Sequence, residues 1–262
     1  MSLNLIILLV LVNLFIVTYF NKIPNNLLIL DNPDGNRKIH AKSTPLFGGF
    51  LILFNIILFI LYSYFTSTQW NIGFLFGNLY LSNIYLLLGF CIFFIGVCDD
   101  LFQMLPRTKI FLMILIFLLL ITTNDEFLIQ ELNVSFLDNN INLKYFSVPI
   151  SLLCYLLFIN ALNLFDGINL QVPLYTIIVS SYLFLNEPTL ILTLVIFISV
   201  FFFIFLNFNG KSFLGDSGIF IIAYLLSTIL VYLHNNINSY NETNFYADYI
   251  FIVMMLPGIE LL

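Results

Sequence analysis

Residues 148–170 read VPISLLCYLLFINALNLFDGINL, an apolar run that ends in a series of polar side chains. A helix that crosses a membrane needs about 20 mainly apolar residues, and this run is close to that length. Asn160, Asn163 and Asp166 follow one another at intervals of three residues near its end. On a helix each such interval turns about 300°, so the three side chains spread over about 120° and share one face. The stretch therefore predicts a membrane helix with a polar face at one end, terminated by Gly167.

The whole chain has the composition of an integral membrane protein. Of its 262 residues 61% are hydrophobic and 8% are charged, whereas soluble domains contain about 25% charged residues. The net charge of −6, with only eight Lys and Arg residues, excludes the basic stripe that nucleic-acid binding requires. Cys91, Cys98 and Cys154 lie in apolar segments without metal-ligand spacing, so we interpret them as packing residues.

Nine apolar segments have the character of membrane helices. Their approximate bounds are 3–20, 47–65, 81–98, 109–124, 148–165, 172–186, 189–208, 217–234 and 249–262. The first segment lacks the basic region and cleavage site of a signal peptide, so we expect it to remain as a membrane helix. No repeat or linker divides the chain, and residues 1–262 are therefore predicted to form a single all-α transmembrane helix bundle. The last segment reaches Leu262 without a polar flank, which predicts truncation at the C-terminus.

The charged residues divide unequally between the two sides that alternating helices create. Loops on one side hold seven of the eight Lys and Arg residues, and the other side holds Lys144 together with most acidic loop residues. Because basic residues concentrate in cytoplasmic loops, the first side is predicted to be cytoplasmic and the N-terminus to lie outside. The seven basic residues are Lys22, Arg37, Lys38, Lys42, Arg107, Lys109 and Lys211.

A loop on the predicted cytoplasmic side, residues 31–49, reads DNPDGNRKIHAKSTPLFGG and is rich in turn-forming residues. Lys38 and His40 lie close together in it, so the loop can present positive charge to phosphate groups. The alternative is an ordinary basic loop of a membrane protein.

A second cytoplasmic cluster, residues 96–109, reads GVCDDLFQMLPRTK and contains the adjacent carboxylates Asp99 and Asp100. Two neighbouring carboxylates near a membrane repel each other and are costly to bury unless they share a cation or a proton. The pair therefore suggests a metal site or a general base. The alternative is a solvated pair at a helix end.

The polar face of residues 160–166 has two interpretations. The amides of Asn160 and Asn163 can bind hydroxyl and carbonyl groups of a substrate, and Asp166 can bind a metal or a hydrogen-bond donor. Hydrogen bonds between helices inside the bundle are the structural alternative.

The fourth cluster, residues 206–218, reads LNFNGKSFLGDSG and places Lys211 ahead of Asp216 in a glycine-flanked turn before an apolar run. Backbone N–H groups at a helix start favour anions, and Asp216 can hold a divalent cation that bridges phosphates. Simple capping of the helix by Asp216 is the alternative.

The four motifs, in this order, resemble those of a known family. RKIH with PLFGG, GVCDD, NALNLFDG and FLGDSG are similar to the motifs of the polyprenyl-phosphate N-acetylhexosamine-1-phosphate transferases, glycosyltransferase family 4. The resemblance implies a bundle of ten or eleven helices in the full-length protein, with an active site that faces the cytoplasm. It also implies transfer of a sugar-1-phosphate from a UDP-sugar to undecaprenyl or another polyprenyl phosphate, with release of UMP and with Mg²⁺ or Mn²⁺ as the cofactor.

The resemblance also implies roles for individual residues. Asp216 is expected to be a magnesium ligand, while Asp99 and Asp100 are expected to serve the lipid phosphate, one of them as its base. Asp166 is placed with the catalytic residues and, with Asn163, at the nucleotide-sugar site. The remaining residues expected to bind substrate are Lys38, His40, Asn160, Asn207, Lys211 and Phe213, the last by stacking on uracil.

Two departures from the family pattern concern the donor. Where many relatives read DGLDGL this chain reads DGINLQ, so Asn169 replaces an aspartate and Leu170 a glycine. Relatives also carry a histidine-rich cytoplasmic loop, which we expect to follow Leu262. The identity of the UDP-sugar is therefore not predicted.

Two other classes compete with the enzyme. A catalytically inactive relative that binds polyprenyl phosphate would keep the same fold, and an ion-coupled transporter also needs carboxylates in a membrane. The transporter is disfavoured because the carboxylates lie at one surface and no repeat is present. Expected partners of the enzyme are the UDP-sugar, the polyprenyl phosphate, membrane lipids and a second copy in a homodimer, at the cytoplasmic membrane of a bacterium.

Overall fold

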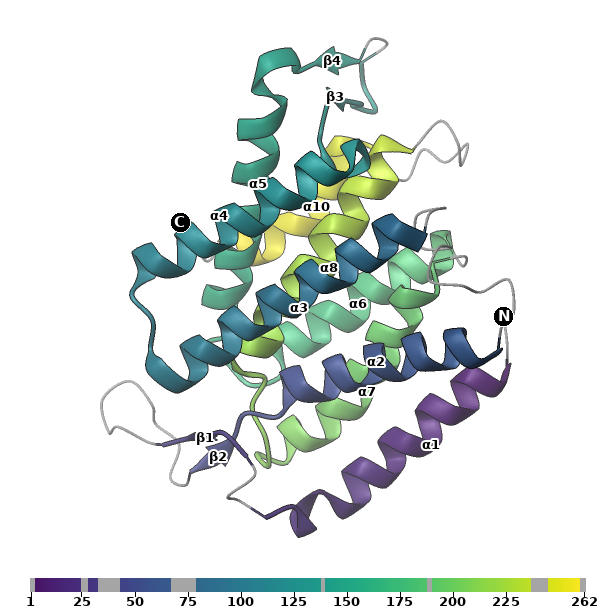
Figure 1. Cartoon of the computed structure of the whole chain (residues 1–262), viewed down its shortest axis with the longest axis vertical. Helices are drawn as coiled ribbons and strands as arrows, with labels where there is room; N and C mark the ends of the chain where they lie inside the picture. Colours follow the sequence, from purple (N-terminus) through teal and green to yellow (C-terminus); the bar gives the residue numbers. More distant parts are fainter. Residues whose placement is uncertain are drawn as a thin grey trace.

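The computed structural model describes residues 3–24, 28–32, 43–66, 79–137, 140–187, 190–236 and 245–259. Each of the nine apolar segments falls on one helix of this part of the chain, which confirms the all-α fold (Figure 1). The helices are α1 (Leu3–Tyr19), α2 (Gly48–Thr66), α3 (Leu79–Phe102), α4 (Pro106–Thr123), α5 (Ser147–Phe165), α6 (Gln171–Asn186), α7 (Ile191–Phe208), α8 (Gly215–Asn235) and α10 (Ala247–Gly258).

Seven of these helices are long and apolar enough to cross a membrane, so the protein is a multi-pass membrane protein. The two shorter ones are α6, with 16 residues, and α10, with 12. Short elements join the helices. They are the 3-10 helices η1 (Phe20–Lys22), η4 (Asp125–Phe127) and η5 (Lys144–Phe146) and the antiparallel pairs β1 (Leu30–Asp31) with β2 (Thr44–Pro45) and β3 (Glu131–Leu132) with β4 (Ile141–Asn142).

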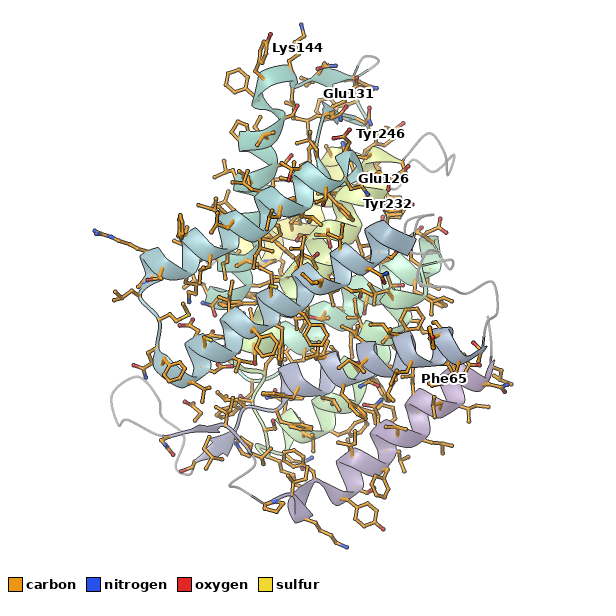
Figure 2. The ribbon with its side chains drawn as sticks, in the orientation of Figure 1. Phe65, Glu126, Glu131, Lys144, Tyr232 and Tyr246 are labelled. Atoms are coloured by element: carbon orange, nitrogen blue, oxygen red, sulfur yellow. The ribbon has the colours of Figure 1, made fainter. Side chains whose placement is uncertain are left out.

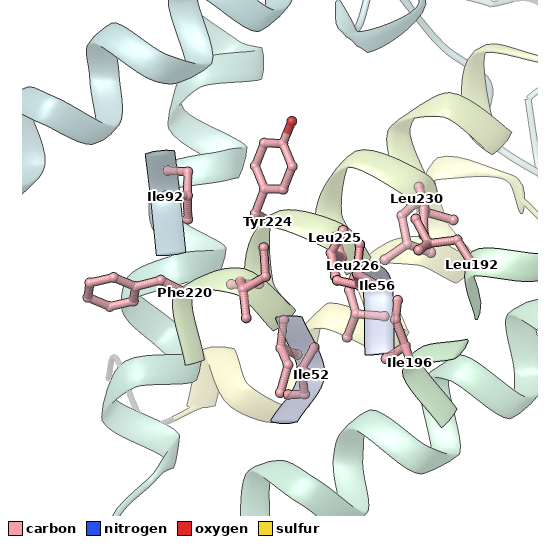
Figure 3. Close-up of a cluster of buried hydrophobic side chains, with 14 of the residues drawn as sticks. Ile52, Ile56, Ile92, Leu192, Ile196, Phe220, Tyr224, Leu225, Leu226 and Leu230 are labelled. Carbon is pink, nitrogen blue, oxygen red and sulfur yellow. The ribbon is translucent and has the colours of Figure 1, made fainter. Parts of the chain in front are cut away.

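Helix α8 is the centre of the bundle. The apolar stretch of α8 is 94% buried inside the protein, whereas that of α1 is 22% buried. The difference arises because α2, α3 and α5 pack around α8, while α1 lies at the edge of the bundle. Figure 3 shows the apolar core between these helices, where Ile52 and Ile56 of α2 and Ile92 of α3 approach the side chains of α8. Since lipid tails are as apolar as this core, close packing and polar contacts must hold the helices together.

Glycines bring two backbones against the start of α8. A Cβ atom on Gly49 of α2 would lie 2.5 Å from the backbone nitrogen of Gly218. A Cβ atom on Gly96 of α3 would lie 2.4 Å from the Cα atom of Ser217. Real Cβ atoms are not found this close to other atoms, so only glycine permits both contacts. The first turn of α8 is therefore held between the backbones of α2 and α3.

Buried polar side chains add specific contacts between helices. Asn13 of α1 and Asn55 of α2 are both fully buried and exchange two amide hydrogen bonds, of 2.6 and 3.0 Å. The hydroxyl of Tyr224 on α8 donates to the carbonyl of Tyr85 on α3 over 2.8 Å. Inside a membrane such bonds fix which helix faces pair.

The described ends of successive helices alternate between the two ends of the bundle, as the sequence predicts. The end of α8 lies beside η4 and β3, because Asn235 donates to the carbonyls of Glu126 and Leu128. Glu126, Glu131 and Lys144 lie toward this end in Figure 2, away from the β1–β2 pair. The start of α8 lies at the opposite end with the end of α3 and the start of α2, and the described parts of the sequence motifs lie there.

Candidate active site

Asp100 holds the first turn of α8. Its Oδ1 accepts a hydrogen bond of 2.8 Å from the backbone N–H of Asp216, and its Oδ2 accepts one of 3.1 Å from that of Ser217. The first N–H groups of a helix lack partners within the helix and carry partial positive charge, so a carboxylate from α3 caps α8 favourably. Gly215 makes the approach possible with a φ of +75°, since a Cβ there would lie 3.0 Å from Oδ2 of Asp100. The two oxygens of Asp100 thus fix the backbone of α8 at Asp216, the residue after Gly215.

Asp99 is paired with Lys109, one of the basic residues of the predicted cytoplasmic side. Its Oδ2 lies 2.6 Å from Nζ of Lys109, and its Oδ1 accepts a hydrogen bond of 2.9 Å from the N–H of Met104. A tight turn between α3 and α4, with Gln103 at a φ of 49°, brings the first turn of α4 back to α3. Lys109 also lies 5.2 Å from the ring centroid of Phe220 on α8. It is therefore held between α3, α4 and α8.

Asp166 lies directly after α5 and belongs to the same carboxylate cluster. Burial, with a contribution from the negative charge of Asp100, raises the pKa of the Asp166 carboxyl from 3.8 to about 7. The carboxyl of Asp216 likewise interacts electrostatically with those of Asp99 and Asp100. Four carboxylates thus share one end of the bundle, with Lys109 beside them. Such an arrangement favours the binding of a cation.

The two asparagines of the α5 face lie near this cluster with different surroundings. Both are partly buried. The amide nitrogen of Asn160 donates a 2.7 Å hydrogen bond to the carbonyl of Leu156, one turn earlier in its own helix. Asn163 lies one turn closer to Asp166, at the end of α5. Of the two asparagines, Asn163 is therefore the one nearer in the chain to Asp166.

Asn207 joins two loops of the site. Its Oδ1 accepts a 2.8 Å hydrogen bond from the N–H of Leu170, in the turn that follows Asp166. Its Nδ2 donates a 2.9 Å hydrogen bond to the carbonyl of Ser212, in the loop that precedes Asp216. The amide is 3% exposed, so it serves these loops from inside the protein.

The loop before α8 also pairs with the PLFGG motif. The N–H of Phe213 donates to the carbonyl of Pro45 over 2.9 Å, and the carbonyl of Phe213 accepts from Phe47 and Gly48 over 3.2 Å each. The ring of Phe213 is partly buried and Lys211 is exposed. The PLFGG motif and the loop before α8, more than 160 residues apart in the chain, are therefore joined by backbone hydrogen bonds on one side of the site.

The family model for glycosyltransferase family 4 matches residues 82–234, more than half of the chain. The chain belongs to glycosyltransferase family 4. The matched range contains three of the four motifs from which the sequence analysis inferred this family, which confirms that inference. In this family 4 chain the remaining motif, PLFGG, lies before the matched range and pairs with the loop that precedes Asp216.

A relative from Bacillus subtilis (strain 168) bears the name "Probable undecaprenyl-phosphate N-acetylglucosaminyl 1-phosphate transferase". It is 26% identical over 211 residues, which cover 76% of this chain and 54% of the relative. The family 4 chain thus spans about half the length of the curated relative that it matches.

The predicted site residues are partly brought together. Asp99, Asp100, Asp166 and Asp216 form the cluster, and Asn207 and Phe213 belong to the loops beside it. Lys38 and His40 lie outside the described residues. Sequence reasoning missed Lys109, although its position ten residues after Asp99 and just past Pro106 is compatible with a helix that turns back toward the pair.

The carboxylates fit a Mg²⁺ ion that is bound together with substrate. Among the described residues, no three His, Cys, Asp or Glu side chains form a ready metal site. Mg²⁺ prefers oxygen ligands and usually binds through one or two carboxylates, water and the phosphates of a substrate. Asp166 and Asp216 can supply carboxylates of that kind. Mn²⁺ uses similar ligands.

Proposed function

We propose that this chain acts as a phosphoglycosyl transferase. It transfers a sugar-1-phosphate, of an N-acetylhexosamine, from a UDP-sugar to undecaprenyl or another polyprenyl phosphate and releases UMP. This reaction starts the synthesis of a cell-wall or surface polysaccharide. The observation that carries the proposal is the cluster of four carboxylates and Lys109 at one end of a membrane helix bundle. The name of the Bacillus relative supports the choice of substrates.

The chemistry joins two anionic reactants. An oxygen of the lipid phosphate attacks the phosphorus that carries the sugar, the bond from that phosphorus to the bridging oxygen breaks, and UMP leaves with that oxygen. A phosphate monoester has a second pKa of about 6, so the attacking oxygen is mostly deprotonated at neutral pH. The protein must therefore position the reactants and neutralise their charge more than it must remove a proton.

The residues divide this work. Asp166 and Asp216 would hold Mg²⁺, and the ion would supply positive charge to the diphosphate of the donor. Asp99 holds Lys109 beside the place of the lipid phosphate, and Asp100 fixes the start of α8 and thus Asp216. Asn163 and the ring of Phe213 line the nucleotide-sugar site. In this arrangement Asp100 is a positioning residue.

The protein belongs in the cytoplasmic membrane of a bacterium, with the carboxylate cluster facing the cytoplasm. The unequal distribution of basic residues supports this orientation, because the cluster lies at the end of the bundle that holds Arg107, Lys109 and Lys211. UDP-sugars are cytoplasmic metabolites, so the site faces its donor.

Membranes that contain the full-length protein test the proposal. They are supplied with undecaprenyl phosphate and a panel of UDP-sugars, and UMP and lipid-linked product are measured with and without Mg²⁺. We expect product from one UDP-N-acetylhexosamine, dependent on Mg²⁺ and absent from the Asp216→Asn variant. Absence of product with every donor, in membranes where a known family 4 transferase is active, would refute the transferase. Labelled polyprenyl phosphate that still binds the protein would then identify it as a lipid-binding relative.

A further inference from the structure

Leu170 has a backbone conformation that its side chain does not favour. Its φ is 72°, in the left-handed region where glycine is accepted and a leucine is strained. It is the residue directly before α6 and lies four residues after Asp166. A strained residue persists only where its surroundings enforce the conformation.

Asn207 supplies the contact that enforces it. The Leu170 N–H points at Oδ1 of Asn207 over 2.8 Å, and the Nδ2 group of the same amide is engaged with the Ser212 carbonyl over 2.9 Å. Ser212 is in turn fixed, since its hydroxyl donates to the carbonyl of Pro45 over 3.0 Å. Position 207 needs an acceptor for the Leu170 N–H and a donor for the Ser212 carbonyl on one rigid planar group. Among side chains of this size only an amide offers both.

We propose that Asn207 is a positioning residue that sets the separation between the two walls of the nucleotide-sugar site. One wall is the turn from Asp166 to Leu170, and the other is the loop from Ser212 to Asp216. The inference rests on the proposed function, because it assigns both walls to the UDP-sugar. Asp99 and Lys109 lie on α3 and α4, so the lipid phosphate is bound by elements that the Asn207 bridge does not touch.

The bridge predicts a selective kinetic defect. In Asn207→Asp a carboxylate oxygen replaces the Nδ2 group and faces the Ser212 carbonyl, so the second wall is repelled. We expect the KM for the UDP-sugar to rise about tenfold, with a change of less than about twofold in the KM for polyprenyl phosphate. Asn209→Asp is the matched control, because Asn209 is exposed, directly follows α7, and its amide donates to the carbonyl of Phe205 in that helix. Equal changes in both KM values, or a fall in kcat alone, would overturn the proposal.

The strain at Leu170 gives a second readout that needs no activity. Glycine adopts a positive φ without help, so Leu170→Gly should restore part of the thermal stability and donor KM that Asn207→Ala loses. We expect the double variant to unfold at a higher temperature than Asn207→Ala, but by less than Leu170→Gly alone raises the wild type, because Leu170 can leave its strained conformation once Asn207 is gone. If the wild type transfers no sugar phosphate, the proposed function fails while this coupling still tests the bridge. Additive effects of the two substitutions on unfolding would refute it.

Discussion

The contact between Asp100 and the start of α8 predicts that Asp100→Asn loses stability and activity together. The wild-type carboxylate accepts two backbone hydrogen bonds, and hydrogen bonds to charged groups contribute about 1.5–3 kcal/mol each. The asparagine keeps one acceptor oxygen but turns its NH₂ group toward a backbone N–H, so one bond is lost with the charge. Loss of the charge also relieves repulsion with Asp99, Asp166 and Asp216, which offsets part of the cost.

The net destabilisation expected for Asp100→Asn is about 1–2 kcal/mol. At about 2–4 °C per kcal/mol for a chain of this size, the thermal midpoint should fall by about 2–8 °C. The assay is thermal unfolding of the detergent-solubilised protein without Mg²⁺, run beside the transferase assay. Asp166→Asn is the matched control. It replaces a partly buried carboxylate that makes no hydrogen bond to the start of α8, so it should lower activity and leave the midpoint unchanged or raised.

The refuting result is specific. If Asp100→Asn abolishes transfer while its midpoint stays within about 1 °C of the wild type, Asp100 acts directly on the reactants and its main role is not to position α8. A fall in both quantities, with a raised requirement for Mg²⁺, supports the positioning role.

Three further predictions concern other contacts. Lys109→Met removes the cation that pairs with the buried Asp99, so the thermal midpoint and the affinity for polyprenyl phosphate should both fall. Arg107→Met, at an exposed neighbouring position on the same side, should change neither quantity. A Lys109→Met protein with both quantities unchanged would contradict the pairing. Asn13→Leu leaves the buried Asn55 without its partner and should cost about 0.6–1.7 kcal/mol in thermal or denaturant unfolding, which an unchanged stability would disprove. Hydrogen bonds from Ser135 hold the pKa of Asp248 below its ordinary value of 3.8, so its stabilising contribution is complete above pH 3.8 and declines as the pH falls through the lower folded-state pKa. Asp248→Asn should therefore lower stability at neutral pH and reduce the pH dependence below 3.8, and equal curves for the two proteins would refute this linkage.

Hydropathy was enough to predict the helices, because a membrane helix satisfies its backbone within a single apolar segment. The alternating ends of the loops follow from the same count. The alternation of the apolar segments also predicted that Asp99, Asp100, Asp166 and Asp216 would lie at one end, as they do.

Pairings between distant segments could not be predicted in this way. Lys109 reaches Asp99 only because the turn at Gln103 reverses the chain, and Asn207 meets Leu170 only after α6 and α7 have packed together. Sequence reasoning placed Asn207 in contact with substrate, whereas in the structure its amide is occupied by two loops. The function of an asparagine depends on what faces its donor and its acceptor, which one-dimensional spacing does not contain.

The glycine contacts of Gly49 and Gly96 have a mechanical consequence for the reaction cycle. The backbones of α2 and α3 approach the first turn of α8 so closely that a Cβ atom on Gly49 or Gly96 would overlap it, so α8 has little room to slide or tilt when substrates arrive. Asp99 and Asp100 at the end of α3 and Asp216 at the start of α8 are therefore carried by backbones that are packed against each other. In the free protein the carboxylates therefore repel one another, and a bound cation or a basic side chain can neutralise this repulsion. The motions that admit and release substrate are then expected in the loops that surround the first turn of α8.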